Sequence, residues 1–312
     1  MPNEAKHIPV LLNECIENLN IKPDGIYVDG TLGLGGHSEQ ILKRLDTGRL
    51  IGIDRDESAI RRTGERLAQY ADKMTLVHGN FCDVSQILDE LGIDAVDGML
   101  FDLGVSSPQL DEAERGFSYM SDAPLDMRMD NTSALTAYTV VNDWSEAELA
   151  RILRDFGEER YARRIASRIA ERRSEKPIET TLELVDVIRS AMPAAALREK
   201  QHPAKRSFQA IRIAVNDELG AVDKMMKTAP DRLKPGGRLC VISFHSLEDR
   251  IVKTGIAARE NGCTCPREAP ICVCGFKQTL RSVYRKPILP DEDELNFNPR
   301  ARSAKLRVAE RV

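Results

Sequence analysis

The sequence predicts an α/β fold, a doubly wound and mostly parallel sheet into which a helical domain is inserted. Three observations support this. Short apolar segments alternate with helix-like stretches over the first hundred or so residues, residues 145–200 are almost wholly helix-like, and an apolar segment returns at 238–246. The length of 312 residues also exceeds what one compact core usually serves.

Four strand-like segments open the chain, at residues 25–30, 49–54, 74–79 and 96–104, and each is short, apolar and followed or ended by Gly or Asp. Helix-like stretches at 37–45, 56–71 and 83–92 connect them, with Asp56 and Asp83 as predicted N-caps and Gly92 as a predicted helix stop. Right-handed crossovers between such strands produce a doubly wound layer.

The pattern changes after Gly104. Residues 105–135 are irregular, 145–200 are helical, and one long helix is expected over 207–233, followed by a turn at "KPGG" and a strand over 238–246. A last strand, 303–311, is expected to pair antiparallel at an edge. We therefore expect residues 1–110 and 205–312 to form one discontinuous domain and 111–204 an inserted, mainly helical domain.

Composition limits the cellular setting and the partners. No apolar run is long enough to span a bilayer, and the N-terminus lacks the basic and apolar regions of a signal peptide, so we expect a cytoplasmic protein. The net charge is −4, yet residues 151–212 hold 15 Lys or Arg against 9 Asp or Glu. This segment is either a phosphate-contacting surface or a solvated helical face with its own ion pairs.

Glycines gather between the first strand and the first helix, in "VDGTLGLGGHS" at 28–38. Glycine permits positive φ and lets a ligand approach the backbone closely. Asp54 ends the next strand, where an acid accepts hydrogen bonds from ribose hydroxyls, and the segment therefore predicts a nucleoside-containing cofactor. Ser38 stands where the dinucleotide fingerprint needs its third glycine, and no P-loop lysine is present.

Further polar and aromatic residues follow the other strands. Phe81, after the third strand, is placed to lie beside an adenine ring, and Asp102 ends the fourth strand. Carboxylates at Asp29 and Asp102 favour a positively charged cofactor and repel a pyrophosphate. This pattern resembles the class I methyltransferases that use S-adenosylmethionine (AdoMet), which have a Rossmann-like sheet.

Longer segments make the resemblance more specific. They include "HIPVLLNE" (7–14), "DGTLGLGGHS" (29–38), "FDLGVSSPQLD" (101–111), "RGFSY" (115–119), "PLDMRM" (124–129), "HPAKRSFQAIRIAVNDEL" (202–219), "LKPGGRL" (233–239), "ISFHSLEDRIVK" (242–253) and "NPRARSAKLRVAE" (298–310). In this order and over nearly the whole chain, the sequence resembles the bacterial ribosomal RNA small-subunit methyltransferase H family (RsmH, formerly MraW). The resemblance implies methyl transfer from AdoMet to the exocyclic N4 of a cytosine in the decoding centre of 16S rRNA, with that rRNA or the 30S particle as partner.

The resemblance also implies roles for individual residues. It places Gly35, Gly36 and His37 against the amino-acid portion of AdoMet, Asp54 on the ribose, Phe81 beside the adenine, and Asp102 and Gln109 near the methionine moiety. For His37, the alternative is a helix-start residue that points to solvent. The inserted domain, 111–204, then serves substrate recognition.

Methylation of cytosine N4 calls for a proton acceptor near the target base. Asp102 is the first candidate and His245 a weaker one, with Phe244 placed to stack on the base. The Asn/Asp-Pro-Pro-aromatic stretch of many amino-methyltransferases is replaced here by "DLGVSS". Given the resemblance, the phosphate-contacting interpretation of the basic segment is favoured, through Arg163, Arg164, Arg168, Arg172, Arg173, Lys205 and Arg206.

Seven cysteines are present. Cys15, Cys82 and Cys240 stand in apolar or helical contexts that predict buried packing residues. The other four, Cys263, Cys265, Cys272 and Cys274, form either a structural zinc site or four thiols in a turn-rich loop, and neither predicts a catalytic role.

Two rival functions share some of these features. An NAD(P)-dependent oxidoreductase has the same kind of sheet, but Asp29 beside the glycine loop opposes a pyrophosphate. A non-catalytic RNA-binding ribosome-assembly factor with a vestigial nucleoside pocket predicts loss of the cofactor positions, whereas Gly33, Gly35, Asp54 and Asp102 are all in place.

Overall fold

The computed structural model describes residues 9–265 and 273–312, apart from the side chains of 107 and 108. The chain forms two compact units. The first runs to Gly104 and resumes at Leu219, and the second runs from Val105 to Glu218. These boundaries differ from the expected 110/111 and 204/205, because helix α10 (Lys205–Asn216) places Phe208, Ile211 and Val215 in the core of the second unit. Each unit is described by itself.

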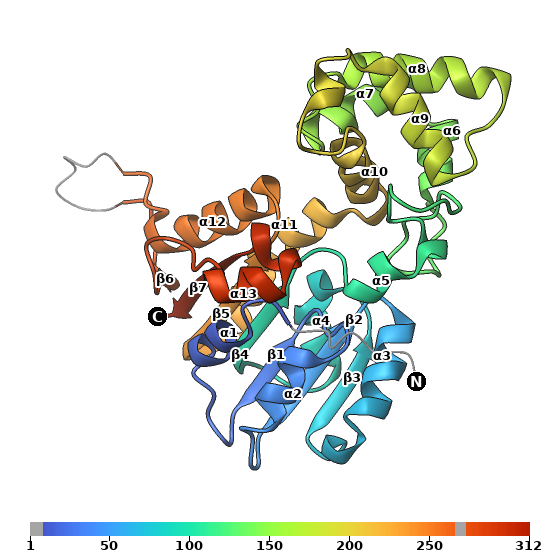
Figure 1. Ribbon diagram of the computed structural model, residues 1–312. Coiled ribbons are helices and arrows are strands. Elements are labelled where there is room, and N and C mark those ends of the chain that lie inside the picture. The colour runs from blue at the N-terminus through green and yellow to red at the C-terminus, as the bar shows by residue number, and fades with distance from the viewer. Residues whose placement is uncertain (1–8, 266–272) are drawn as a thin grey trace. The chain divides into compact units, whose positions relative to one another are not determined.

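The first unit is built on a sheet that has seven strands among the described residues, in the order β3-β2-β1-β4-β5-β7-β6 (Figure 1). The strands are β1 (Ile26–Asp29), β2 (Arg49–Asp54), β3 (Met74–His78), β4 (Val96–Asp102), β5 (Leu233–Ser243), β6 (Leu280–Ser282) and β7 (Lys305–Arg311). The first five strands pair in parallel, whereas β7 is antiparallel to both β5 and β6. The predicted fold class is confirmed.

Two details of the sheet differ from expectation. The last strand is antiparallel, as predicted, but β6 pairs with its outer side, so β7 does not form the edge. The "KPGG" segment is not a turn before β5 but part of that strand. Opposite it, Val96 pairs with Leu233 and Gly98 with Arg238, so β5 carries several extra residues as an irregularity in the register.

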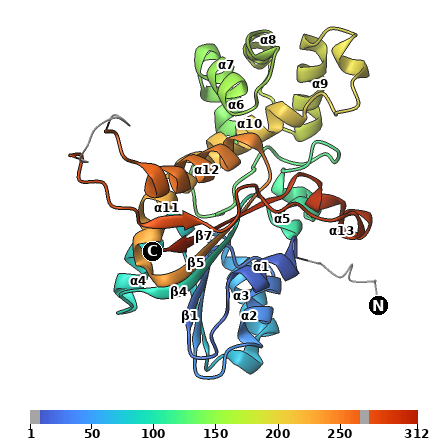
Figure 2. The same ribbon diagram turned by 90° about the vertical axis from the view of Figure 1, so that its left-hand side faces the viewer.

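Helices cover both faces of the sheet, as Figure 2 shows edge-on. On one face α4 (Val84–Glu90), α11 (Glu218–Thr228) and α12 (Ser246–Asn261) pack on a core that includes Met99 and Phe101. On the other face α1 (Leu12–Asn18), α2 (Gly36–Leu42) and the segment after α3 (Glu57–Arg66) pack on a core that includes Leu100. Alternate residues of β4 thus face opposite layers, and the strand is buried on both faces from Val96 to Phe101 for this reason.

Of the predicted helix ends, those at Asp56 and Gly92 are confirmed and the N-cap at Asp83 is wrong. Asp56 is the N-cap of α3, and its side chain accepts a hydrogen bond from the N–H of Ser58. Gly92 follows α4 with a φ of 69°, as expected of a helix stop. Asp83 precedes α4 but makes no side-chain cap, because its carboxylate pairs with Lys224. Asn80 caps the preceding short 3-10 helix instead, by accepting from the N–H of Cys82.

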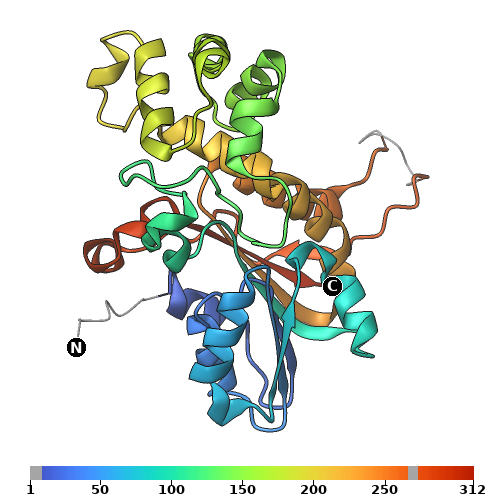
Figure 3. The same ribbon diagram turned by 90° about the vertical axis from the view of Figure 1, so that its right-hand side faces the viewer.

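The second unit is mainly helical, and its longer helices can be followed in Figure 3. Its helices are α5 (Ser107–Asp111), α6 (Ala137–Asp143), α7 (Glu146–Asp155), α8 (Ala162–Glu175), α9 (Thr181–Ala191) and α10. Capping boxes at Ser145 and Thr180 start α7 and α9. The single long helix expected over 207–233 is wrong, because Asp217 adopts a φ of 47° and ends α10.

Among the described residues, no helix has the length and apolar character required to cross a membrane.

Gly30, directly after β1, is required by close packing. A Cβ atom there would lie 2.3 Å from a ring carbon of Phe101 and 3.2 Å from the Cβ of Phe81. We expect Gly30→Ala to lower the free energy of unfolding by about 1–3 kcal/mol, the usual cost of overpacking a core. Urea unfolding measures this loss. Gly79→Ala is the control, since its nearest neighbour would be an ordinary contact at 3.5 Å, and equal losses in the two variants would contradict the packing argument.

Candidate active site at the carboxyl ends of the strands

Three carboxylate residues end three neighbouring parallel strands of the first unit. Asp29 ends β1, Asp54 ends β2 and Asp102 ends β4. The strand order reverses between β1 and β4, since β2 and β3 lie to one side and β5 to the other. Ligands of doubly wound sheets bind outside the carboxyl ends of the strands at such a reversal, and the structure brings these three predicted residues to that place.

Asp54 holds the glycine loop that joins β1 to α2. One carboxylate oxygen accepts a hydrogen bond from the N–H of Gly33 at 2.7 Å, and the other accepts from the N–H of Asp56 at 2.9 Å. Gly33 has a φ of 50°, in the left-handed region that glycine tolerates, and its carbonyl accepts from Thr63 Oγ1 at 2.8 Å. The acid that was expected to bind a ribose therefore also fixes the loop.

The following residues of the loop have packing reasons of their own. A Cβ on Gly35 would lie 2.5 Å from a methyl carbon of Thr63, and one on Gly36 would lie 2.2 Å from the ring of Pro9. His37 is buried, with its Nε2 atom 3.1 Å from the carbonyl oxygen of Val10. The solvent-facing alternative for His37 is therefore wrong, and the packing of the chain itself already demands glycine at 35 and 36.

Hydrogen bonds link the ends of β1 and β4. Ser38 Oγ donates to one carboxylate oxygen of Asp29 at 2.7 Å, and the N–H of Thr31 donates to the other at 3.2 Å. The hydroxyl of Thr31 accepts from the N–H of Asp102 at 2.6 Å. Neither Thr31 nor Ser38 was expected in these roles from the sequence, although both lie within the glycine segment at 28–38.

The electrostatics of this strand end favour a cation. Burial raises the pKa of Asp29 to about 6. The pKa of Asp102 is raised to about 8, first by burial and then by the negative charges of Asp29, Glu248 and Glu294. The Oδ1 atom of Asp102 is buried and has no hydrogen-bond partner among the described residues. A positively charged ligand would relieve the desolvation and the mutual repulsion of these groups.

Two of these acids were not foreseen. Glu294, on α13 (Glu292–Phe297), accepts a hydrogen bond from the N–H of Leu11 at 2.8 Å. Glu248 forms a capping box with His245 at the start of α12. The Nδ1 atom of His245 accepts from the N–H of Glu248 at 3.5 Å, whereas Nε2 lies 3.1 Å from Glu248 Oε1 and makes no hydrogen bond among the described residues.

The remaining predicted residues lie in two places. The Phe81 side chain, only 9% exposed, packs its ring against Phe101 with the centroids 5.9 Å apart. Phe244 is half-buried and follows β5. Gln109 belongs to the second unit, where its side-chain oxygen accepts a hydrogen bond from the N–H of Ser106 at 3.1 Å. Its predicted role beside the methionine moiety stays a prediction.

Comparison with known proteins accounts for this arrangement. Residues 4–312 match the MraW methylase family. The chain belongs to that family. Curated relatives named "Ribosomal RNA small subunit methyltransferase H" are similar to it over almost their full length. That of Clostridioides difficile is 55% identical over 99% of this chain and 100% of its own length, and that of Lachnospira eligens is 56% identical over 99% and 98%. Membership of a methylase family sets aside the oxidoreductase alternative.

A solved structure is also similar to this MraW methylase family member. It is the crystal structure of a "putative rRNA-methylase" from Clostridium thermocellum, and the match covers 98% of this chain and 100% of the other, with a TM-score of 0.47 and 11% identity. This structural similarity carries no argument beyond the family match of the sequence.

The second unit of this MraW methylase family member uses several of its predicted RNA-contacting arginines internally. Arg173 donates to the carbonyl oxygens of Val141 and Trp144, both at 2.6 Å. Arg168 pairs with Glu171 on the same helix. These two side chains therefore support the fold of α8 and its neighbours.

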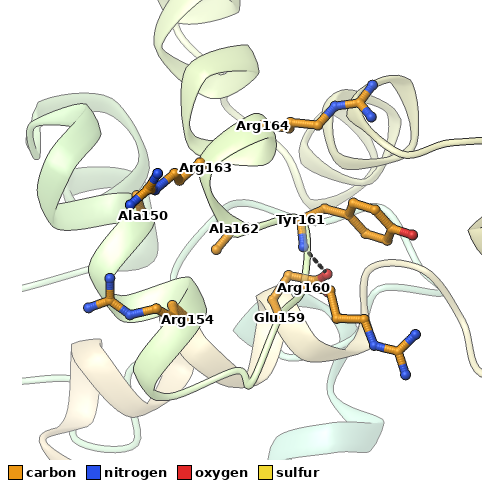
Figure 4. Close-up of a pocket in the computed structure, with 8 residues that line it drawn as sticks. All are labelled: Ala150, Arg154, Glu159, Arg160, Tyr161, Ala162, Arg163 and Arg164. Atoms are coloured by element: carbon orange, nitrogen blue, oxygen red, sulfur yellow. Dashed lines mark hydrogen bonds between the residues drawn. The ribbon is translucent and has the colours of Figure 1, made fainter.

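Other arginines surround a pocket of about 310 Å³ at the start of α8. Figure 4 shows Arg154, Arg160, Arg163 and Arg164 around it, with the N–H of Tyr161 hydrogen-bonded to Glu159. Arg154 pairs with Asp155, and Arg160 lies 4.0 Å from Glu199. The side chains of Arg163 and Arg164 are exposed and make no hydrogen bond or ion pair within the described part of the chain. This pocket therefore presents cationic side chains to which an anion can bind.

We expect the free energy of unfolding to depend on pH because the pKa of Asp102 is raised in the folded protein. A carboxyl group whose pKa is higher in the folded state stabilises the fold at pH values below its unfolded-state pKa, and this contribution is lost as the pH rises to the folded-state value of about 8. The free energy of unfolding of Asp102→Asn, relative to wild type, should therefore increase between about pH 5 and about pH 8 and then level off.

Urea unfolding of the ligand-free proteins at several pH values between about 5 and about 8 measures the difference in free energy of unfolding between Asp102→Asn and wild type. Asp46→Asn is the control, because Asp46 is exposed and its substitution changes no desolvation cost. A difference between Asp102→Asn and wild type that stays constant with pH would contradict the raised pKa.

Proposed function

We propose that this protein transfers a methyl group from AdoMet to the exocyclic N4 of a cytosine in the decoding centre of 16S rRNA. The observation that carries the proposal is the Asp102 carboxyl beside Asp29 at the strand reversal, with one buried oxygen that lacks a partner among the described residues, in a chain of the MraW methylase family. The relatives' name supports small-subunit rRNA as the substrate class. Ribosomal subunits assemble in the cytoplasm, so the proposal places the protein there.

The residues of the first unit fit AdoMet. The Asp54 carboxylate accepts from the backbone N–H groups of Gly33, Asp56 and Arg55, which leaves one of its about four lone-pair sites for a ribose hydroxyl. Phe81 is the proposed neighbour of the adenine, and the acidic groups at Asp29 and Asp102 suit a cofactor with a sulfonium and an ammonium group. When bound, AdoMet supplies an electrophilic methyl group and a neutral thioether leaving group.

Asp102 is the proposed proton acceptor. The lone pair of cytosine N4 is delocalised into the ring, and a carboxylate that accepts a hydrogen bond from the amino group helps to localise it. As N4 gains a methyl group, it loses a proton, which Asp102 takes. Binding of a cation nearby lowers the pKa of Asp102 from its ligand-free value of about 8, so that the carboxylate form prevails in the complex. His245 is the weaker candidate, because its Nδ1 already accepts from the N–H of Glu248 and its Nε2 lies 3.1 Å from the Glu248 carboxylate.

Replacement of Asp102 by Asn tests this role. The amide keeps the size of the side chain and an acceptor oxygen but cannot take the proton, so we expect methyl transfer to fall by about 10²–10⁴-fold, the usual contribution of a general base. Transfer of labelled methyl groups from AdoMet to 30S particles that lack the modification measures the rate, and nucleoside mass spectrometry identifies N4-methylcytosine.

The binding of AdoMet, followed by isothermal titration, separates the possible results. Unchanged methylation by Asp102→Asn would remove Asp102 from the mechanism. A wild-type protein that shows neither heat of AdoMet binding nor methyl transfer would instead be the non-catalytic RNA-binding factor. A methyl group found on another atom or another nucleotide would overturn the proposed specificity alone.

The arginine pocket of the second unit is the proposed RNA contact. Arg163 and Arg164 are exposed and unpaired within the described residues, so no internal ion pair has to break before they bind phosphate. Phosphate contacts of this kind give affinity and salt dependence rather than sequence specificity. The flipped-out target base is then read by other residues.

Replacement of both Arg163 and Arg164 by Ala should weaken binding to a 16S rRNA fragment and lower the slope of log K against log salt by about 1–2, since each phosphate contact contributes about 0.7–0.9. Filter binding at several salt concentrations measures the slope. Arg168→Ala is the matched control, on the same helix and equally exposed but paired with Glu171. A loss of slope in the control equal to half of that in the double variant, and so equal for each arginine removed, would show that general charge, not this pocket, binds the RNA.

A further inference from the structure

A cluster of thiols lies outside the site described above, in the segment between α12 and β6. The Sγ atoms of Cys263, Cys265 and Cys274 all lie within 4.8 Å of one another. Cys263 and Cys274, eleven positions apart in the sequence, have their sulfur atoms 3.6 Å apart. Cys272, the fourth cysteine of the motif, lies outside the described residues.

The spacing of these sulfur atoms matches a metal site. Zinc binds thiolates at about 2.3 Å in tetrahedral geometry, so two sulfur ligands of one ion lie about 3.8 Å apart. The Cys263–Cys274 separation is close to this edge length, and Cys265 falls within reach of the same centre. Three thiolates are soft ligands, which select zinc over the oxygen-preferring cations magnesium and calcium.

The backbone around the cluster also favours thiolates. The N–H of Val273 points at Cys265 Sγ, with the nitrogen 3.2 Å from the sulfur. A backbone donor of this kind stabilises negative charge on a ligand sulfur and fixes its orientation, as the groups behind metal ligands generally do.

The base of the segment is held by the fold itself. The N–H of Thr279 donates to the carbonyl of Arg259 at 3.0 Å, and the carboxylate of Glu260 accepts from both the N–H and the hydroxyl of Ser282. Arg259 in turn pairs with Asp231. The two ends of the segment are therefore fixed, and a bound ion would cross-link the part of it that carries the cysteines.

We propose that Cys263, Cys265 and Cys274 bind one zinc ion, which ties down the connection between α12 and β6. Binding converts the thiols to thiolates and releases their protons to solvent, with no change of oxidation state. The site is structural. It is separate from the strand-end carboxylates, so its failure would leave the proposed methyl transfer untouched.

Metal analysis of the full chain tests the proposal. Protein purified under reducing conditions, stripped with a chelator and reloaded with zinc should retain about one ion per chain after gel filtration. Cys263→Ser and Cys274→Ser should lose it. Cys82→Ser is the matched control, because Cys82 lies in the sheet core and should leave the metal content unchanged. Circular dichroism checks that all three variants are folded.

Substitution of zinc by Co²⁺ provides a second test, because an ion bound elsewhere without thiolate ligands would not give the same spectrum. Thiolate-ligated tetrahedral Co²⁺ shows a sulfur-to-metal charge-transfer band and strong visible bands, which should appear in wild type and in Cys82→Ser and be absent from the two cluster variants. Metal content and spectra that are equal in the cluster variants and the control would overturn the proposal. So would a disulfide between Cys263 and Cys274, found by mass spectrometry of alkylated protein prepared under the same reducing conditions.

Discussion

The desolvation of carboxyl groups at the ends of β1 and β4 is the constraint on which the candidate site depends. Parallel pairing puts Asp29 and Asp102 at the same end of the sheet, where the Asp29 side chain and the Oδ1 atom of Asp102 are buried. Burial raises the pKa of Asp29 to about 6, and burial together with the negative charges of Asp29, Glu248 and Glu294 raises the pKa of Asp102 to about 8. Burying these carboxyl groups costs the folded state free energy. A bound cation would offset that cost by stabilising their ionised forms.

The surrounding residues hold this arrangement rigidly before any ligand binds. Asp54 fixes Gly33, Ser38 and Thr31 bind Asp29, and Thr31 also accepts from the N–H of Asp102. The glycine loop, two strand ends and the start of α2 are thus connected by short hydrogen bonds. A methyl transfer, in which donor and acceptor must be aligned, benefits from such preorganisation because little order remains to be imposed on binding.

The sequence predicted the parts of the fold that depend on local pattern. The first four strands are apolar runs ended by a polar or glycine residue, and Asp56 caps its helix as its position suggests. The predictions that were wrong concern contacts between distant residues or particular backbone angles. The pairing of β6 outside β7, the role of Lys224 in drawing Asp83 away from its helix, and the left-handed turn at Asp217 all depend on partners or backbone angles that a linear pattern does not contain.

The same distinction applies to the candidate site. Asp29, Asp54 and Asp102 were predictable because parallel strands bring their ends together, whereas Glu294 reaches this region from the other end of the chain and binds Leu11 across 283 positions. Charge counting likewise identified the basic segment of the second unit, but it did not distinguish Arg173, which binds two carbonyl groups of its own unit, from Arg163 and Arg164, which do not.

This division of the arginines has a physical consequence for an enzyme that acts on RNA. The carboxylates that suit a cationic cofactor also repel a phosphate backbone, so the attraction for RNA has to come from another part of the chain. Here the acids belong to the strand ends of the first unit and the unpaired arginines to the second unit. A net charge of −4 therefore conceals two surfaces of opposite sign, each with its own ligand to attract. The charge of the residues around each site, rather than the net charge of the chain, determines what that site binds.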